Sequence, residues 1–115
     1  MINTVQKILG QSAPTATVNT SIYTVPSSAQ CKCSVIVCNR STVDTIRIAL
    51  LLANETLATK HWILYDYSLA SGAVIQISDL NINSGDQIVV YSLNGTSSFT
   101  ATGEEINRSR MVMNE

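Results

Sequence analysis

The sequence predicts an all-β protein: a single antiparallel β-sandwich of seven or eight strands, with no long helix. Short runs rich in β-branched and aromatic residues recur along the chain, and several of them alternate apolar with polar side chains. Turn signals separate these runs at intervals of about 8–12 residues, which is typical of sandwiches. An immunoglobulin-like topology and a jelly-roll both fit the pattern. At 115 residues the chain is long enough for one hydrophobic core but not for two.

The clearest strand runs from Cys31 to Cys38. Its odd-numbered residues share one face, which is apolar, and its even-numbered residues share the other, which is mixed. A turn opened by Pro26 precedes it, because proline fixes its own φ and has no amide proton to donate to a sheet. Residues 21–25 before that turn predict the partner strand. We therefore expect a half-buried strand entered through a proline turn.

The N-terminal residues allow two interpretations. Residues 4–9 could form a short strand or an extended arm, because their apolar side chains follow neither the helical nor the strand period. Residues 15–25 are rich in Thr, Val, Ile and Tyr and fit a strand. The chain is expected to divide into three parts: an N-terminal arm (1–14), a β-sandwich domain (15–106) and a C-terminal tail (107–115).

Further strands are predicted in the second half. Residues 45–53 alternate, but Leu51 interrupts the polar face, so this strand should be covered on both sides. Residues 61–69 form the most aromatic run, and simple alternation places Tyr65 and Tyr67 on one face and Trp62 on the other. Asn94-Gly95 is the strongest hairpin signal in the chain. The remaining strands are predicted over residues 73–78, 87–93 and 97–106.

Charged residues make up only 13% of the chain, about half of the roughly 25% found in typical soluble domains. Such a surface is poorly protected against association. Either partners cover it, or uncharged polar side chains keep it solvated. The net charge of −1 predicts no general attraction to nucleic acid or anionic membranes, and no apolar run approaches the ~18 residues of a membrane span. The first residues lack the order of a secretion signal, so we expect synthesis in a cytosol.

The sequence predicts no enzymatic site, metal or cofactor. His61 is the only histidine, and a structural role is the simpler interpretation; the alternative is a hydrolase that uses it as a base. Cys31 and Cys33 are read as small buried apolar residues in a reducing compartment. Three aromatic residues could bind sugar: Trp62, Tyr65 and Tyr67. A role in the core or in an interface is the simpler interpretation.

Three motifs in the first half carry a resemblance to a known group, and three shorter ones follow later. They are Lys7-Ile-Leu-Gly-Gln11, Ile22-Tyr-Thr-Val-Pro26, Val35-Ile-Val-Cys-Asn-Arg-Ser41, Leu64-Tyr-Asp66, Ser84-Gly-Asp86 and Gly103-Glu-Glu-Ile106. Together they resemble small virion proteins of tailed bacteriophages over about residues 7–106. The chain departs from that group at Cys31 and Cys33, where Val- or Ala-type residues are expected. The resemblance implies a sandwich that is present in many copies on a phage particle.

The expected function is that of a virion structural protein made in the host cytoplasm. The first expectation is a capsid cement, or decoration, protein that forms a homotrimer and bridges capsid subunits. The alternative is a tail, baseplate or fibre-attachment protein that could also bind a receptor or glycan. Expected partners are other copies and the major capsid protein or tail proteins. The residues predicted to bind partners, partly as arms that order on contact, are Ile2, Val5, Ile8, Leu9, Trp62, Tyr65, Tyr67, Met111, Val112 and Met113.

Overall fold

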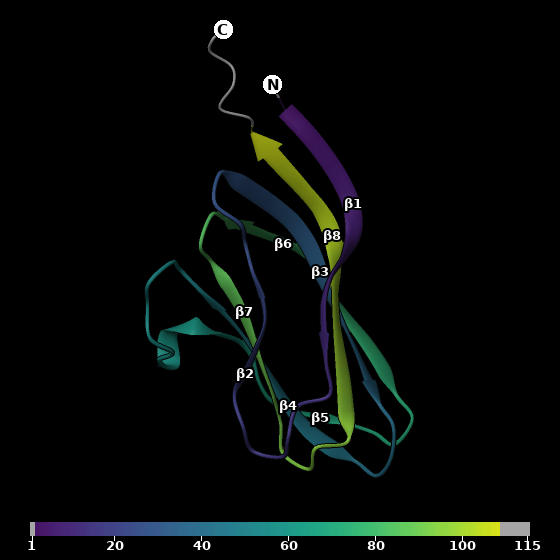
Figure 1. Ribbon diagram of the computed structural model, residues 1–115. Coiled ribbons are helices and arrows are strands. Elements are labelled where there is room, and N and C mark those ends of the chain that lie inside the picture. Colours follow the sequence, from purple (N-terminus) through teal and green to yellow (C-terminus); the bar gives the residue numbers. More distant parts are fainter. Residues whose placement is uncertain (1, 109–115) are drawn as a thin grey trace, which may run out of the picture.

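The computed structural model describes residues 2–108 and consists almost entirely of β-strands (Figure 1). A single short 3-10 turn, Thr59–His61, interrupts the strands in this range, and no described helix is long and apolar enough to cross a membrane. The strands are β1 (Ile2–Ser12), β2 (Thr20–Thr24), β3 (Ala29–Asn39), β4 (Asp44–Leu51), β5 (Trp62–Leu69), β6 (Val74–Asn83), β7 (Gln87–Ser92) and β8 (Ser97–Arg108).

The eight strands form two four-stranded antiparallel sheets. The first has the order β1-β8-β3-β6 and the second has the order β2-β7-β4-β5. The pairs β1–β8, β2–β7, β3–β6 and β4–β5 are those of one long hairpin that has been folded over into two layers. This is the jelly-roll arrangement, so the structure confirms the predicted β-sandwich and decides between the two topologies that the sequence allowed.

The core lies between the two sheets and follows the predicted alternation. On β3, Val35 and Val37 are fully buried, whereas Lys32 and Cys38 on the opposite face are exposed. Ile46 and Ile48 from β4 and Phe99 from β8 complete the centre. Burying each such side chain contributes about 1.5–3 kcal/mol, so this interface between the sheets is the main source of stability.

The N-terminal residues form a strand rather than a separate arm. Strand β1 pairs with β8 through ten register positions, from Ile2 opposite Arg108 to Ser12 opposite Phe99. The sandwich therefore already includes residues 2–12, and it does not begin at the predicted boundary at residue 15. Residues 3–8 are exposed on both faces, so they have no buried side to impose a period. Figure 1 shows this part of β1 running beside the end of β8, beyond the shorter strands of the second sheet.

Each of the four edge strands contains a register shift, and the interior pairs contain none. The pair β3–β8 runs through eleven partners and the pair β4–β7 through six without interruption. On β5 and β6 the extra residues accompany Asp66 and Asp79, which have left-handed φ values of 49° and 62°. Bulges of this kind bend an edge strand away from unwanted pairing.

Gly10 allows the two sheets to meet along one side of the sandwich. It follows the bulge on β1 at Leu9, next to the bulge on β2 at Ile22. A Cβ atom on Gly10 would overlap the carbonyl oxygen of Ile22. Only glycine therefore lets the backbone of β1 approach that of β2 this closely.

Candidate interaction surfaces

The outer edge of β1 carries three of the predicted partner-binding residues whose side chains the structure describes. The Val5 side chain is 37% exposed and that of Ile8 is 61% exposed, whereas Leu9 is half-buried against the core. No described strand pairs with this edge of β1, so its outward-facing backbone groups are open to a partner. The predicted site at Met111, Val112 and Met113 lies outside the described residues, as does the side chain of Ile2.

A buried carboxylate ties β1 to the rest of the sandwich. Glu105 on β8 is 5% exposed, accepts a hydrogen bond of 2.6 Å from the Tyr23 hydroxyl, and pairs with the Lys7 ammonium at 3.2 Å. The hydrogen bond from Tyr23 is the largest cause of a lowered pKa at Glu105, and burial raises the pKa of Tyr23. The three side chains come from three strands, so they hold β1, β8 and β2 in register.

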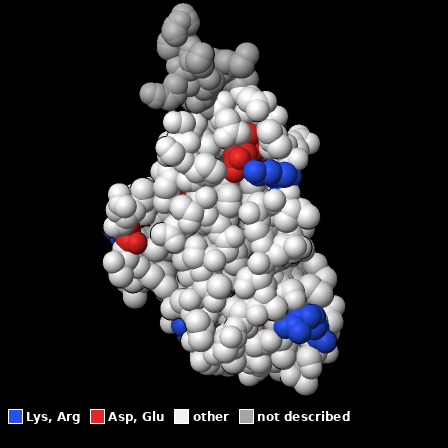
Figure 2. Space-filling model, in the orientation of Figure 1, with Lys and Arg blue, Asp and Glu red and all other residues white. Residues whose placement is uncertain are grey.

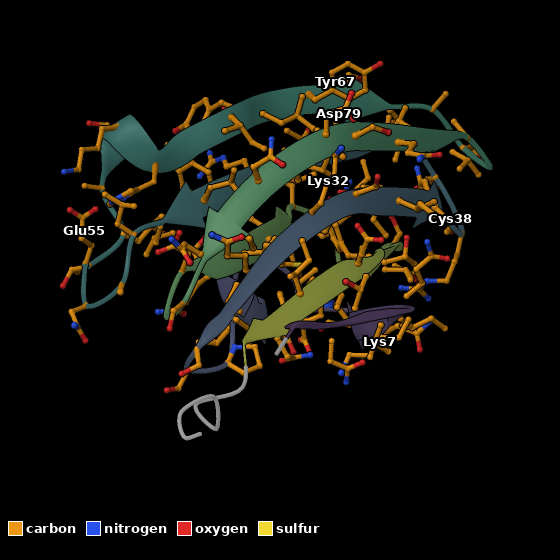
Figure 3. All side chains as sticks on the ribbon, turned by 90° about the horizontal axis from the view of Figure 1, so that it is seen from above. Lys7, Lys32, Cys38, Glu55, Tyr67 and Asp79 are labelled. Atoms are coloured by element: carbon orange, nitrogen blue, oxygen red, sulfur yellow. The ribbon has the colours of Figure 1, made fainter. Side chains whose placement is uncertain are left out.

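The outer face of the first sheet is hollowed beside β1. A shallow groove of about 500 Å³ is lined there by Gln6, Ile8, Lys32 and Glu104, among others. Gly103 on β8 also lines the groove, and a Cβ atom there would overlap Cys33 of the neighbouring strand β3. Figure 3 shows Lys7 on β1 at one side of the molecule and Tyr67 on β5 at the other. The groove is therefore far from the predicted aromatic site.

An arginine organises the aromatic residues on the outer face of the second sheet. The Arg47 guanidinium lies 4.3 Å from the ring centres of both Tyr65 and Tyr91, and 5.7 Å from that of Trp62. Its Nε donates to the Asp66 carboxylate at 2.6 Å. Arg47 thus occupies ring faces that a ligand would otherwise stack against. Sequence reasoning did not single out this residue.

The structure does not group Trp62, Tyr65 and Tyr67 as the alternation predicted. Two extra residues in β5 shift the parity of the strand, so Trp62 and Tyr65 lie together with ring centres 5.5 Å apart. Tyr67 pairs instead with Ile46, a core residue of β4, and so takes the opposite face.

Trp62 has an additional packing role. It is half-buried against a small apolar cluster of Ala49, Leu51 and Val89 on the outer face of the second sheet. Leu57, from the loop after β4, packs on the same cluster. This confirms the prediction that the strand containing Leu51 is covered on both sides.

Two buried polar residues, Asn39 and Asp44, organise the loops at one end of the sandwich. The Asn39 amide donates to the carbonyl oxygens of Thr42 and Leu69, at 2.7 and 3.0 Å. The Asp44 carboxylate accepts hydrogen bonds from the hydroxyls of Ser92 and Ser97. Burial alone would raise the pKa of Asp44, but these bonds and two backbone amides lower it.

Sequence reasoning missed this network, although it left a signal. Asn39 continues the buried positions of β3, and Asp44 precedes Ile46 and Ile48 at the same spacing on β4. Polar residues at buried positions require internal hydrogen-bond partners. Both residues lie at strand ends, next to loops. This position indicates that they hold the loops in place rather than take part in catalysis.

His61 has no free nitrogen for catalysis. Its Nδ1 accepts a hydrogen bond from the Ala58 amide at 2.8 Å, and its Nε2 lies 2.7 Å from a Glu55 carboxylate oxygen. The ring is 6% exposed. The amide fixes Nδ1 as an acceptor, so Nε2 carries the proton and donates to Glu55. The geometry therefore supports the structural interpretation of His61.

The cysteines are free thiols. Cys31 and Cys33 are buried in the core and Cys38 is exposed, as the alternation predicted. Burial raises the pKa of Cys33 to about 12, which keeps the thiol protonated. Within the part of the chain that the structure describes, no three His, Cys, Asp or Glu side chains group closely enough to hold a metal ion.

The charged side chains are scattered. Figure 2 shows one face of the molecule, on which they form only small separate groups among uncharged residues. Most of that face is therefore available for contacts that need no ion pairing.

No protein-family model matches the sequence, and no curated protein is significantly similar to it. Among solved structures, the chain is similar to a chain of the T13 viral particle of infectious bursal disease virus (IBDV). That likeness has a TM-score of 0.55 and 9% identity and covers 91% of this chain and 30% of that chain. The likeness shows a shared fold.

Two further solved structures are similar. The infectious bursal disease virus Gx strain gives a TM-score of 0.47 at 11% identity, covering 92% of this chain and 32% of that chain. The Tobacco streak virus coat protein has a TM-score of 0.42 at 12% identity, and the match covers 99% of this chain and 91% of that chain. The chain thus spans less than a third of the length of the two IBDV chains.

Proposed function

We propose that this chain is a structural protein of a tailed-bacteriophage virion, and specifically a capsid cement protein that self-associates and bridges capsid subunits. The observation that carries the proposal is a jelly-roll with few charges and an unpaired β1 edge at residues 3–8. Support comes also from the fold shared with a chain of a viral particle, and from the resemblance of residues 7–106 to small phage virion proteins.

The mechanism is stabilisation of the assembled shell by mass action. A subunit that binds only where capsid proteins meet lowers the free energy of the closed shell relative to its separated parts. Such a bridge needs rigid layers and exposed contact surface rather than an active site. Self-association of the chain is part of this proposal, and no catalytic role is assigned to His61.

Electron microscopy of purified virions tests this proposal. Particles that carry the chain with a bulky protein fused after residue 115 should show extra density on the shell, between capsid subunits. Particles without the chain should release their DNA at a lower temperature, as followed by dye binding on heating. Virions that contain no copy of the chain would contradict the proposal.

A tail or fibre-attachment role with glycan binding is the alternative, favoured by one observation. The Tyr65 ring is 57% exposed on the outer face of the second sheet, beside Trp62 and Arg47. In this case the extra density would lie on the tail, and sugars would change the fluorescence of Trp62. Because Trp62 also packs on Ala49 and Val89, Tyr65→Ala is the cleaner variant for the binding measurement.

A further inference from the structure

We infer that two copies of this chain associate through the N-terminal half of β1, pairing antiparallel across a two-fold axis that passes beside Val5. The two first sheets would then join into one continuous eight-stranded sheet. This inference rests on the self-association proposed above, and it adds the surface, the symmetry and the register.

The first argument is that this stretch is the least protected edge in the described structure. Each of β2, β5 and β6 has its bulge within the paired region, and β5 and β6 also carry an aspartate with positive φ. On β1 the register is continuous from Ile2 to Ile8, and the shift comes only after Ile8. A regular edge with one lysine and no proline is a template for another strand.

The second argument is that both faces of this stretch are uncovered. All side chains from Asn3 to Ile8 are exposed, because this end of the first sheet extends past the second sheet. Seven strand residues span about 23 Å. A second copy can therefore approach without displacing any packed element.

The third argument is that the sequence of this stretch matches itself when it is reversed. Centred on Val5, antiparallel pairing places Val5 opposite Val5, Thr4 opposite Gln6, Asn3 opposite Lys7 and Ile2 opposite Ile8. Apolar residues meet apolar residues and polar residues meet polar ones, which is the pairing that stabilises sheets. A two-fold contact requires such self-complementarity, and this is why the partner is a second copy rather than a different strand.

The charges agree with this register. The one ammonium of the stretch, Lys7, points to the same face as Val5 and is held by Glu105 at 3.2 Å. In the proposed pairing it faces Asn3 of the other copy, so the two lysines are not opposite each other. Like charges directly opposite would destabilise the pair.

The test compares Val5→Lys with Val5→Glu in the full chain, by sedimentation velocity over a range of concentrations. The wild type should form dimers. Each variant alone puts two like charges opposite each other and should raise the dimer dissociation constant about tenfold or more. An equimolar mixture should recover the dimer, because the introduced ammonium then faces the introduced carboxylate. Circular dichroism should show an unchanged β-fold in both.

The matched controls are Val43→Lys and Val43→Glu. Val43 is 55% exposed in the turn between β3 and β4, away from β1, so neither substitution should change the association. A monomeric wild type would overturn both this inference and self-association in solution. A trimer or dimer unaffected by substitution of Val5 would overturn only the β1 contact. Loss of the dimer without recovery on mixing would overturn the two-fold register.

Discussion

At the scale of single residues, a few buried polar side chains hold the loops of one end in place. Asn39 is fully buried, and its amide donates to the backbone of Thr42 in the loop after β3 and of Leu69 at the end of β5. The net contribution of such a hydrogen-bonded side chain to folding stability is small. Its removal is costly, because it leaves buried carbonyl groups without donors.

Asn39→Ala should therefore lower the free energy of unfolding by about 3 kcal/mol, as measured by urea denaturation. Asn94→Ala is the matched control at the same end. Its amide donates to the Val43 carbonyl at 2.9 Å, but Asn94 is exposed, and water can replace the bond. We expect a loss below about 1 kcal/mol there. Equal losses in the two variants would contradict the role given to Asn39.

The buried carboxylate of Glu105 predicts a defined pH dependence. Its pKa is lowered in the folded protein, first by the Tyr23 hydroxyl and then by Lys7. Stability from Glu105 is therefore fully present above the unfolded-state pKa of about 4.3, and it is lost as the pH falls through the lower folded-state pKa.

Glu105→Gln should lower the free energy of unfolding by about 1 kcal/mol at pH 7, because a charged acceptor is replaced by a neutral one. The difference between wild type and variant should stay constant down to about pH 5 and shrink below it. Urea denaturation at pH 7, 5, 4 and 3 measures this. A difference that grows on acidification would contradict the sign of the pKa shift.

At the scale of elements, the close contact between β1 and β2 depends on one glycine. An alanine at position 10 would place its Cβ against the backbone of Ile22, which cannot move as a side-chain end could. Both strands carry their register shift at this point.

Gly10→Ala should cost about 3 kcal/mol or prevent folding, as read from urea midpoints and circular dichroism. Gly72→Ala is the comparison variant. Gly72 has φ of +72°, but nothing lies within 4 Å of its added Cβ, so only the left-handed strain of about 1–2 kcal/mol remains. A milder effect at Gly10 than at Gly72 would show that β1 does not need this close approach.

At the scale of the whole molecule, the exposed half of β1 is separable from the core. Residues 3–8 contribute no member to the core cluster, whereas Leu9 packs against it. Removing residues 1–8 should leave the β-fold intact by circular dichroism while abolishing self-association, and it should lower the thermal midpoint because the Lys7–Glu105 pair and the pairing of residues 2–8 with β8 are lost. Loss of the folded state would show that this stretch supports the sandwich itself.

Local sequence by itself determined most of the strands. Alternation on β3, the Pro26 turn and Asn94-Gly95 each act within a few residues, so they can be read without knowing what the chain folds against. The low proportion of charged residues and the β-rich composition can likewise be read from the sequence alone. The burial of Cys31 and Cys33 and the exposure of Cys38 followed from the same alternation.

Tertiary structure alone decided the jelly-roll topology, the strand at residues 2–12 and the regrouping of the aromatic residues. Strand β1 pairs with a strand that lies between 87 and 106 positions away, from Ser12 opposite Phe99 to Ile2 opposite Arg108, and the exposed faces of residues 3–8 leave no period to detect. The bulges on β5 that bring Trp62 and Tyr65 to Arg47 arise where an edge strand bends. Pairing and bulging depend on neighbours that are distant in sequence, and a one-residue shift reverses the face of every side chain that follows.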